Sequence, residues 1–144
     1  MSSQLALGSM VYGRLAGTAG TALTSILAGG TAAPSVFYQQ APDNAALPYV
    51  VFLYPSGIDD NTSSRRLKDV VLRVYGVAAN PATAGTVDAR IDTLLHRQTF
   101  ASAGGWQNIR LQRENDYQLV TTNAAGVRYY TSGADYRAEI TTTA

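Results

Sequence analysis

The residues Tyr49-Val50-Val51-Phe52-Leu53-Tyr54 are the clearest indication of the fold, because their apolar and aromatic side chains would occupy both faces of a strand. A half-exposed strand or an amphipathic helix would interrupt such a run with polar residues, whereas a strand covered on both sides would not. Its β-branched and aromatic residues also favour strand structure. We therefore predict the central strand of a sheet here, ended by Pro55-Ser56-Gly57.

The residues that follow predict a hairpin and then a helix. The segment from Asp59 to Ser64 is polar and rich in turn-forming residues, and a strand with alternating apolar residues is expected at about 66–77. Asn80-Pro81 then combines a preferred N-cap residue with Pro at the first helical position. Because apolar residues recur at three- and four-residue steps beyond it, we predict a helix over about 81–97.

Before the central strand, apolar residues at helical spacing predict a helix over about 3–28. Gly17 and Gly20 weaken its middle, since each costs about 1 kcal/mol relative to Ala inside a helix. A break into two helices is therefore expected near them, and Gly29-Gly30 provides the end. A short strand is expected at Val36 to Gln40.

The last third of the chain predicts further strands. Alternating residues indicate one strand around Ile109 to Leu111 and another around 117–121, on either side of Asn115-Asp116. In the final segment, apolar residues occupy odd positions before Ser132-Gly133 and even positions after it, which predicts a β-bulge at that point.

The order of helix, strands, helix and strands, with short links between most strands, is typical of the α+β class. We expect two helices packed on a largely antiparallel β-sheet. The 144 residues fit a single domain covering residues 1–144.

Composition excludes several classes of function. Eleven basic and ten acidic residues give a net charge of +1, far from the basic surface of a sequence-specific nucleic-acid binder. The absence of Cys excludes disulfides, thiolate nucleophiles and Cys-based metal sites. The apolar stretch at the N-terminus is broken by Gly8, Gly13 and Arg14, so we expect neither a signal peptide nor a membrane span.

The candidate chemical residues are Asp88, Asp92 and His96, which fall at i, i+4 and i+8 on the predicted second helix. Three ligands on one helix lack the second element that closes a metal site. We expect this side of the helix to face water and a change of His96 to Ala to be tolerated. The chain also has no serine-hydrolase elbow and no glycine-rich nucleotide loop. The sequence therefore predicts no catalytic, metal or cofactor-binding residue, and no enzyme.

The pattern along the chain resembles the tail completion, or tail terminator, family of long-tailed bacteriophages. The segments that carry the resemblance occur in a fixed order, and the third is the most distinctive of them: Val11-Tyr12-Gly13-Arg14-Leu15, Leu23-Thr24-Ser25-Ile26-Leu27, Ala46-Leu47-Pro48-Tyr49-Val50-Val51-Phe52, Asn80-Pro81 and Asp135-Tyr136-Arg137-Ala138-Glu139-Ile140.

The resemblance implies a structural virion protein that forms a ring of about six copies on the head-proximal end of the tail tube. Such a ring stops tube polymerisation, contacts the tail tube protein and a neck or head completion protein, and lets DNA pass through its lumen. It implies no catalytic residue and no cofactor, and assembly in the host cytoplasm. Two alternatives stay open: a head-side adaptor or stopper protein of the neck, and a non-viral α+β ligand-binding module.

The polar link after the central strand is the predicted interface between subunits. Asp59 and Asp60 lie on one side of its tip and Arg65 and Arg66 on the other, so neighbouring copies could pair these charges head to tail around a ring.

Overall fold

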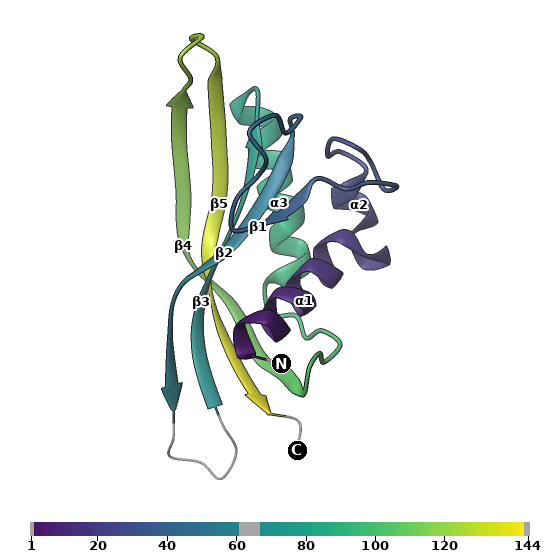
Figure 1. Ribbon diagram of the computed structural model, residues 1–144, viewed down its shortest axis with the longest axis vertical. Helices are drawn as coiled ribbons and strands as arrows, with labels where there is room; N and C mark the ends of the chain where they lie inside the picture. Colours follow the sequence, from purple (N-terminus) through teal and green to yellow (C-terminus); the bar gives the residue numbers. More distant parts are fainter. Residues whose placement is uncertain (1, 61–66, 143–144) are drawn as a thin grey trace.

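In the computed structural model, which describes residues 2–60 and 67–142, the helices lie on one face of a five-stranded sheet (Figure 1). The strand order is β1-β2-β3-β5-β4. The elements in chain order are α1 (Ser3–Ala16), the 3₁₀ turn η1 (Thr18–Gly20), α2 (Thr21–Thr24), β1 (Val36–Tyr38), β2 (Tyr49–Asp60), β3 (Leu67–Ala78), α3 (Pro81–Leu95), β4 (Trp106–Thr122) and β5 (Arg128–Thr142).

The sheet is antiparallel except for the short strand β1, which runs parallel to β2. Helix α3 carries the chain from β3 to the far edge, and β5 then returns between β3 and β4. The α+β class and the largely antiparallel sheet predicted from the sequence are confirmed. The stretch predicted as the central strand forms the first half of β2, where Val50 and Phe52 are buried under the helices. The prediction of a central position was wrong, because β2 lies between the short strand β1 and β3, and β3 is the central strand.

Helix α1 begins at Ser2, whose hydroxyl accepts a hydrogen bond from the N–H of Leu5 at 3.2 Å. The expectation of a helix to residue 28 was wrong, because α1 ends at Ala16 and the chain re-forms only short turns beyond it. The break falls at the two glycines that predicted it. A Cβ at Gly20 would lie 2.0 Å from the carbonyl oxygen of Leu15, so the chain can fold back there only with glycine.

Helix α3 begins as predicted. The Asn80 side chain accepts a hydrogen bond from the N–H of Thr83 at 2.8 Å, and Pro81 occupies the first turn. The helix ends at Leu95, two residues earlier than expected. It packs closely on β3 at Gly76, where a Cβ would lie 2.3 Å from Cγ1 of Val87.

The core lies between the helices and the covered face of the sheet. Tyr136 of β5 is fully buried in it, together with Leu72 of β3 and Ile91 of α3. These residues come from three elements that are distant in sequence, so one core holds the two helices and the sheet together.

Strand β2 is longer than predicted, because Pro55-Ser56-Gly57 does not end it. The pairing with β3 shifts its register between Leu53 and Ser56 and then continues to Asp60. A β-bulge at this point accommodates a proline, which has no N–H to donate to the ladder. The expected polar turn is therefore partly strand.

The bulge predicted in β5 was also wrong, because its pairing with β3 runs without a shift. The shifts lie instead in β4, between Asn108 and Arg110 and between Arg113 and Asn115. With these two β-bulges, β4 is one continuous strand of 17 residues, whereas the sequence predicted two separate strands there. Each inserted residue reverses which face the following side chains of β4 occupy.

Candidate assembly surface

One face of the sheet is left uncovered by the helices (Figure 1). Strand alternation places tyrosines from four strands on this face, at the end nearer the β4–β5 turn. They are Tyr49 of β2, Tyr75 of β3, Tyr117 of β4 and Tyr129 of β5. This outer face is therefore aromatic at one end, although it lies outside the core.

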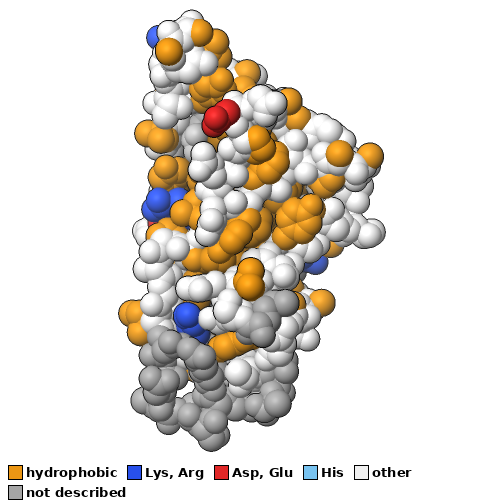
Figure 2. Space-filling model, in the orientation of Figure 1, with side chains coloured by type: hydrophobic (Ala, Val, Ile, Leu, Met, Phe, Trp, Pro, Cys, Tyr) orange, Lys and Arg blue, Asp and Glu red, His pale blue; other side chains and the backbone are white. Residues whose placement is uncertain are grey.

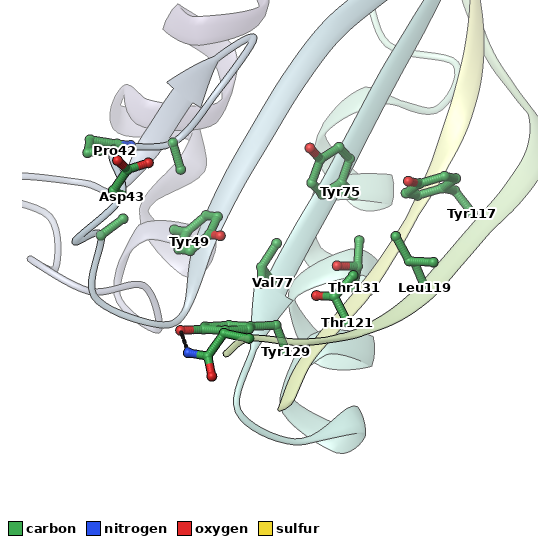
Figure 3. A pocket seen from close by; sticks show the side chains of 13 residues that line it. Pro42, Asp43, Tyr49, Tyr75, Val77, Tyr117, Leu119, Thr121, Tyr129 and Thr131 are labelled. Atoms are coloured by element: carbon green, nitrogen blue, oxygen red, sulfur yellow. Dashed lines mark hydrogen bonds between the residues drawn. The ribbon is translucent and has the colours of Figure 1, made fainter. Parts of the chain in front are cut away.

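The four tyrosines surround a hollow of about 480 Å³ (Figure 3). The loop at residues 41–45 forms one wall, and Leu119 and Thr131 line the floor. The rings of Tyr75 and Tyr117 lie 5.5 Å apart between centroids. Partial burial raises the pKa of the Tyr75 hydroxyl above its ordinary value, and the neighbouring Tyr117 raises it further. The hollow thus offers neighbouring tyrosine rings with neutral hydroxyl groups, which suits a protein partner more than an ion.

Arg73 borders the aromatic end of the outer face. Its guanidinium carbon lies 4.6 Å from the centroid of the Tyr117 ring, and its Nε lies 2.8 Å from Oδ1 of Asp135 on the adjacent strand. The second nitrogen, Nη2, donates to the other carboxylate oxygen at 3.3 Å. The hydrogen bond to Asp135 is the main cause of the raised pKa of Arg73. The charge is held in place and largely neutralised.

Beyond Arg73, the outer face carries further cross-strand charges. Arg137 lies 3.1 Å from Asp69 and 3.9 Å from Glu114, and Arg110 lies 3.9 Å from Glu139. Exposed pairs of this kind contribute about 0–1 kcal/mol each. Their signs alternate, so this half of the face is polar and balanced rather than a basic track for nucleic acid.

A second apolar surface lies near β1. Leu5 and Tyr12 of α1 and Tyr38 of β1 are exposed by 59%, 46% and 39%, and they surround a shallow pocket whose floor includes Phe52. Figure 2 shows hydrophobic side chains gathered over the middle of this view, where Figure 1 places β1 and β2 beside α1.

The structure brings together Asp88, Asp92 and His96, but not in the way the sequence predicted. Arg113 of β4 forms a bidentate pair with Asp88 at 3.0 Å and approaches Asp92 at 3.4 Å. Its backbone N–H donates to Nδ1 of His96 at 3.0 Å. The expectation that this side of α3 faces water was therefore wrong.

This cluster continues into the core through Tyr136, whose hydroxyl donates to Asp92 at 2.9 Å. The hydrogen bond to Asp88 is the main cause of the raised pKa of Arg113. Asp88 and Asp92 are thus both paired with Arg113, and Asp92 also accepts the hydrogen bond from Tyr136. These contacts join α3 to the sheet. Within residues 2–60 and 67–142, no three His, Asp or Glu side chains are placed to hold a metal ion.

Two of the four predicted interface residues lie in the part of the chain that the structure describes. Asp59 and Asp60 belong to the last part of β2, where their backbones pair with Lys68 and Leu67. Arg65 and Arg66 lie outside the described residues. The pairing of these four charges between copies is thus still a prediction.

Sequence reasoning missed the tyrosine-lined hollow. The signal was present, because apolar residues of β5 before Gly133 alternate out of phase with those after it. We interpreted that change as a bulge, whereas Tyr129 lies on the outer face and Tyr136 on the covered one. Nine tyrosines in 144 residues were a further indication of an aromatic surface.

The fold is shared with a chain of a solved structure described as the virion of a native gene transfer agent (GTA) particle. The two chains align with a TM-score of 0.62 and 18% sequence identity, covering 98% of this chain and 99% of the other. At this identity the likeness shows the fold. No curated protein sequence matches the chain. Within the described residues, none of the helices is both long and apolar enough to cross a membrane.

The chain therefore belongs to a class of α+β proteins with one sheet face left uncovered by helices, a fold that also occurs in a chain of this virion particle. More particularly, the chain belongs to the family of the tail completion protein gp17, whose model matches residues 10–141. The family resemblance found in the sequence is confirmed. The protein is therefore a structural component of phage tails.

Proposed function

We propose that the protein forms a closed ring of about six copies at the head-proximal end of a tail tube, where it ends tube polymerisation and joins the tail to the head. The observation that carries this proposal is the match to the tail completion family over residues 10–141. A terminator has to bind the last ring of the tube on one side and the neck on the other. The tail tube protein and a neck or head completion protein are its proposed partners.

Two apolar surfaces on the described part of the chain support an assembly role. The hollow around Tyr117 lies on the outer face of the sheet. The patch around Tyr38 lies beside α1, at the edge of the sheet formed by β1. Soluble monomers seldom expose several large apolar groups together unless a partner covers them. Surfaces on different sides of one subunit suit heterologous contacts, which generate rings when the rotation closes.

The charges at the end of the β2–β3 hairpin are proposed as an additional contact between copies. Asp59 and Asp60 of one copy would pair with Arg65 and Arg66 of the next. Each exposed pair contributes only about 0.2–1 kcal/mol, so the effect would arise from repetition around the ring. DNA would pass through the lumen without sequence-specific contacts, as the net charge of +1 allows.

Deleting the gene distinguishes a terminator from a head-side adaptor or stopper. Without a terminator, tubes grow past their normal length and do not join heads. Without a neck protein, tails of normal length accumulate beside filled heads. Tail lengths measured by electron microscopy decide between the two, and tails of normal length would overturn the terminator function. The mass of the assembly released intact from particles gives the number of copies.

A further inference from the structure

The distal part of the β4–β5 hairpin, residues 118–131, forms an arm whose tip projects beyond the helices (Figure 1). Because Ala78 of β3 pairs with Tyr130, only residues 121–129 form a ribbon of two strands. Leu119, Val120 and Val127 in this arm are exposed by 47%, 57% and 49%. A two-stranded ribbon is at best marginally stable in water unless one of its faces is covered. The exposed apolar residues indicate that the arm is covered in the assembled protein.

The two faces of the arm carry different side chains. Leu119, Tyr129 and Thr131 line the hollow on the outer face. Because side chains alternate along a strand, Val120, Thr122 and Arg128 lie on the opposite face, which we call the back of the arm. The register supports this, since Thr122 is paired with Arg128 and Val120 with Tyr130.

One acidic side chain stands at the wall of the hollow. Asp43 is exposed in the loop at residues 41–45 and forms no ion pair with a described residue. Other acidic residues do form ion pairs: Asp69, Asp88, Asp92, Glu114, Asp116, Asp135 and Glu139. Arg128 on the back of the arm is likewise exposed, and no carboxylate among the described residues pairs with it. The front and the back of the same subunit thus carry opposite unpaired charges beside apolar groups.

We propose that the back of the arm of one copy covers the tyrosine-lined hollow of the next copy, with Val120 over the rings and Arg128 paired with Asp43. The inference rests on the proposed ring and names the contact that builds it. The hollow lies on the outer face of the sheet and the back of the arm faces the opposite way, so the two surfaces differ from each other. A two-fold dimer would need one patch to meet itself, so this contact is heterologous and leads from copy to copy around a ring.

Disulfide trapping tests the contact, because the chain contains no Cys that would give background cross-links. The test variant combines Ala45→Cys in the hollow with Thr122→Cys on the back of the arm. The control combines Ala45→Cys with Thr93→Cys, an exposed position on α3. After oxidation of assembled particles, we expect a ladder of covalent multimers up to the full ring for the test pair and monomers for the control. Monomers for the test pair, or a ladder that stops at the dimer, would overturn the proposal.

A charge exchange tests the ion pair in the same particles. Asp43→Arg or Arg128→Asp alone should lower the cross-linking yield roughly fivefold, as expected for one exposed ion pair. The double variant D43R/R128D should restore it, because the pair re-forms between neighbouring copies. Equal yields in all three variants would show that the two charges do not meet.

Imaging of the particles separates failure of this contact from failure of the proposed function. If a ring is present but the hollow holds a segment of another virion protein, the contact is wrong and the ring stands. If the chain is present as a single copy, both are wrong.

Discussion

The rings of Tyr75 and Tyr117 meet across Gly133, at 5.5 Å between their centroids. Gly133 lies in β5 and is paired with Tyr75 on one side and with Tyr117 on the other. With no side chain of its own, the glycine leaves the space above β5 open, and the two rings cover its backbone from both sides. The contact between two of the tyrosines that surround the hollow therefore depends on a residue that contributes no side chain to it.

The first prediction is that Gly133→Ala destabilises the fold. The added Cβ would lie 2.2 Å from the carbonyl oxygen of Val74 and 2.5 Å from Cα of Tyr75, both of which are backbone atoms of β3. Separating the strands costs about 1–3 kcal/mol, measured as the free energy of unfolding in urea.

Gly85→Ala is the matched control for this change. Gly85 is exposed on α3, and a Cβ there would meet nothing within 4 Å. Since Ala is the better helix former, this variant should gain about 0.5–1 kcal/mol. Equal effects at the two positions would show that the close approach at Gly133 is unimportant.

Local patterns predicted the parts of the fold that local chemistry determines. The Asn80-Pro81 start of α3, the break at Gly17 and Gly20 and the strand at Tyr49 each depend on residues that are adjacent in sequence. They were predicted because capping, glycine flexibility and strand preference act over a few residues.

The register of the sheet was not predictable in the same way. The positions of the β-bulges in β4 depend on its register with β5, in which Arg113 is paired with Tyr136. That register is set by the side chains that the two strands bury in the core. The hollow was missed for the same reason, since its tyrosines come from four strands. The pairing of Arg113 with Asp88 likewise joins residues 25 positions apart.

The second prediction concerns Arg113, which we expect to stabilise the contact between α3 and the sheet. Arg113→Met keeps much of the side-chain volume. Among the described residues, it leaves Asp88, whose side chain is 14% exposed, with only the hydroxyl of Ser132 as a hydrogen-bond donor, at 3.4 Å. The loss of a charged, partly buried pair should lower the free energy of unfolding by about 2 kcal/mol.

The control for Arg113 is Arg110→Met on the same strand. Arg110 is 62% exposed and lies 3.9 Å from Glu139, so its replacement should change stability by less than about 0.5 kcal/mol. Urea unfolding at pH 7 measures both. A loss at Arg110 as large as that at Arg113 would mean that burial does not decide the strength of these pairs.

The third prediction is a loss of stability at high pH that depends on Tyr136. Burial raises the pKa of its hydroxyl above the ordinary value of 10.0, and the negative charge of Asp92 raises it further. The unfolded chain therefore releases this proton first. The contribution is complete below pH 10 and is lost as the pH rises above it, at about 1.4 kcal/mol per pH unit.

Tyr136→Phe should destabilise the protein at pH 8 but not at pH 11. At pH 8 it removes the hydrogen bond to Asp92 and should cost about 1 kcal/mol. At pH 11 the cost should disappear, because the wild-type protein has lost the stabilisation and the variant has no hydroxyl to ionise. A cost that stays constant from pH 8 to pH 11 would contradict the raised pKa.

Tyr54→Phe separates ionisation from hydrogen bonding. Burial also raises the pKa of the Tyr54 hydroxyl, which is buried without a hydrogen-bond partner among the described residues. Its removal should therefore stabilise the protein by about 1 kcal/mol already at pH 8. A destabilised Tyr54→Phe at pH 8 would show that this hydroxyl has a partner.

The last prediction concerns the end of the β2–β3 hairpin, where the sequence placed an interface between copies. Asp60 is paired with Leu67, so replacing residues 61–66 by Asn-Gly closes the hairpin with a two-residue turn and keeps its register. The free energy of unfolding should change by less than about 0.5 kcal/mol, because the buried core of β3 begins only at Val70. The variant lacks Arg65 and Arg66, so the yield of infectious particles with full-length tails should fall. A variant that keeps the original length, with Arg65 and Arg66 replaced by Ser, distinguishes loss of charge from loss of length. If both variants assemble at the normal yield, the end of the hairpin is only a connection between two strands.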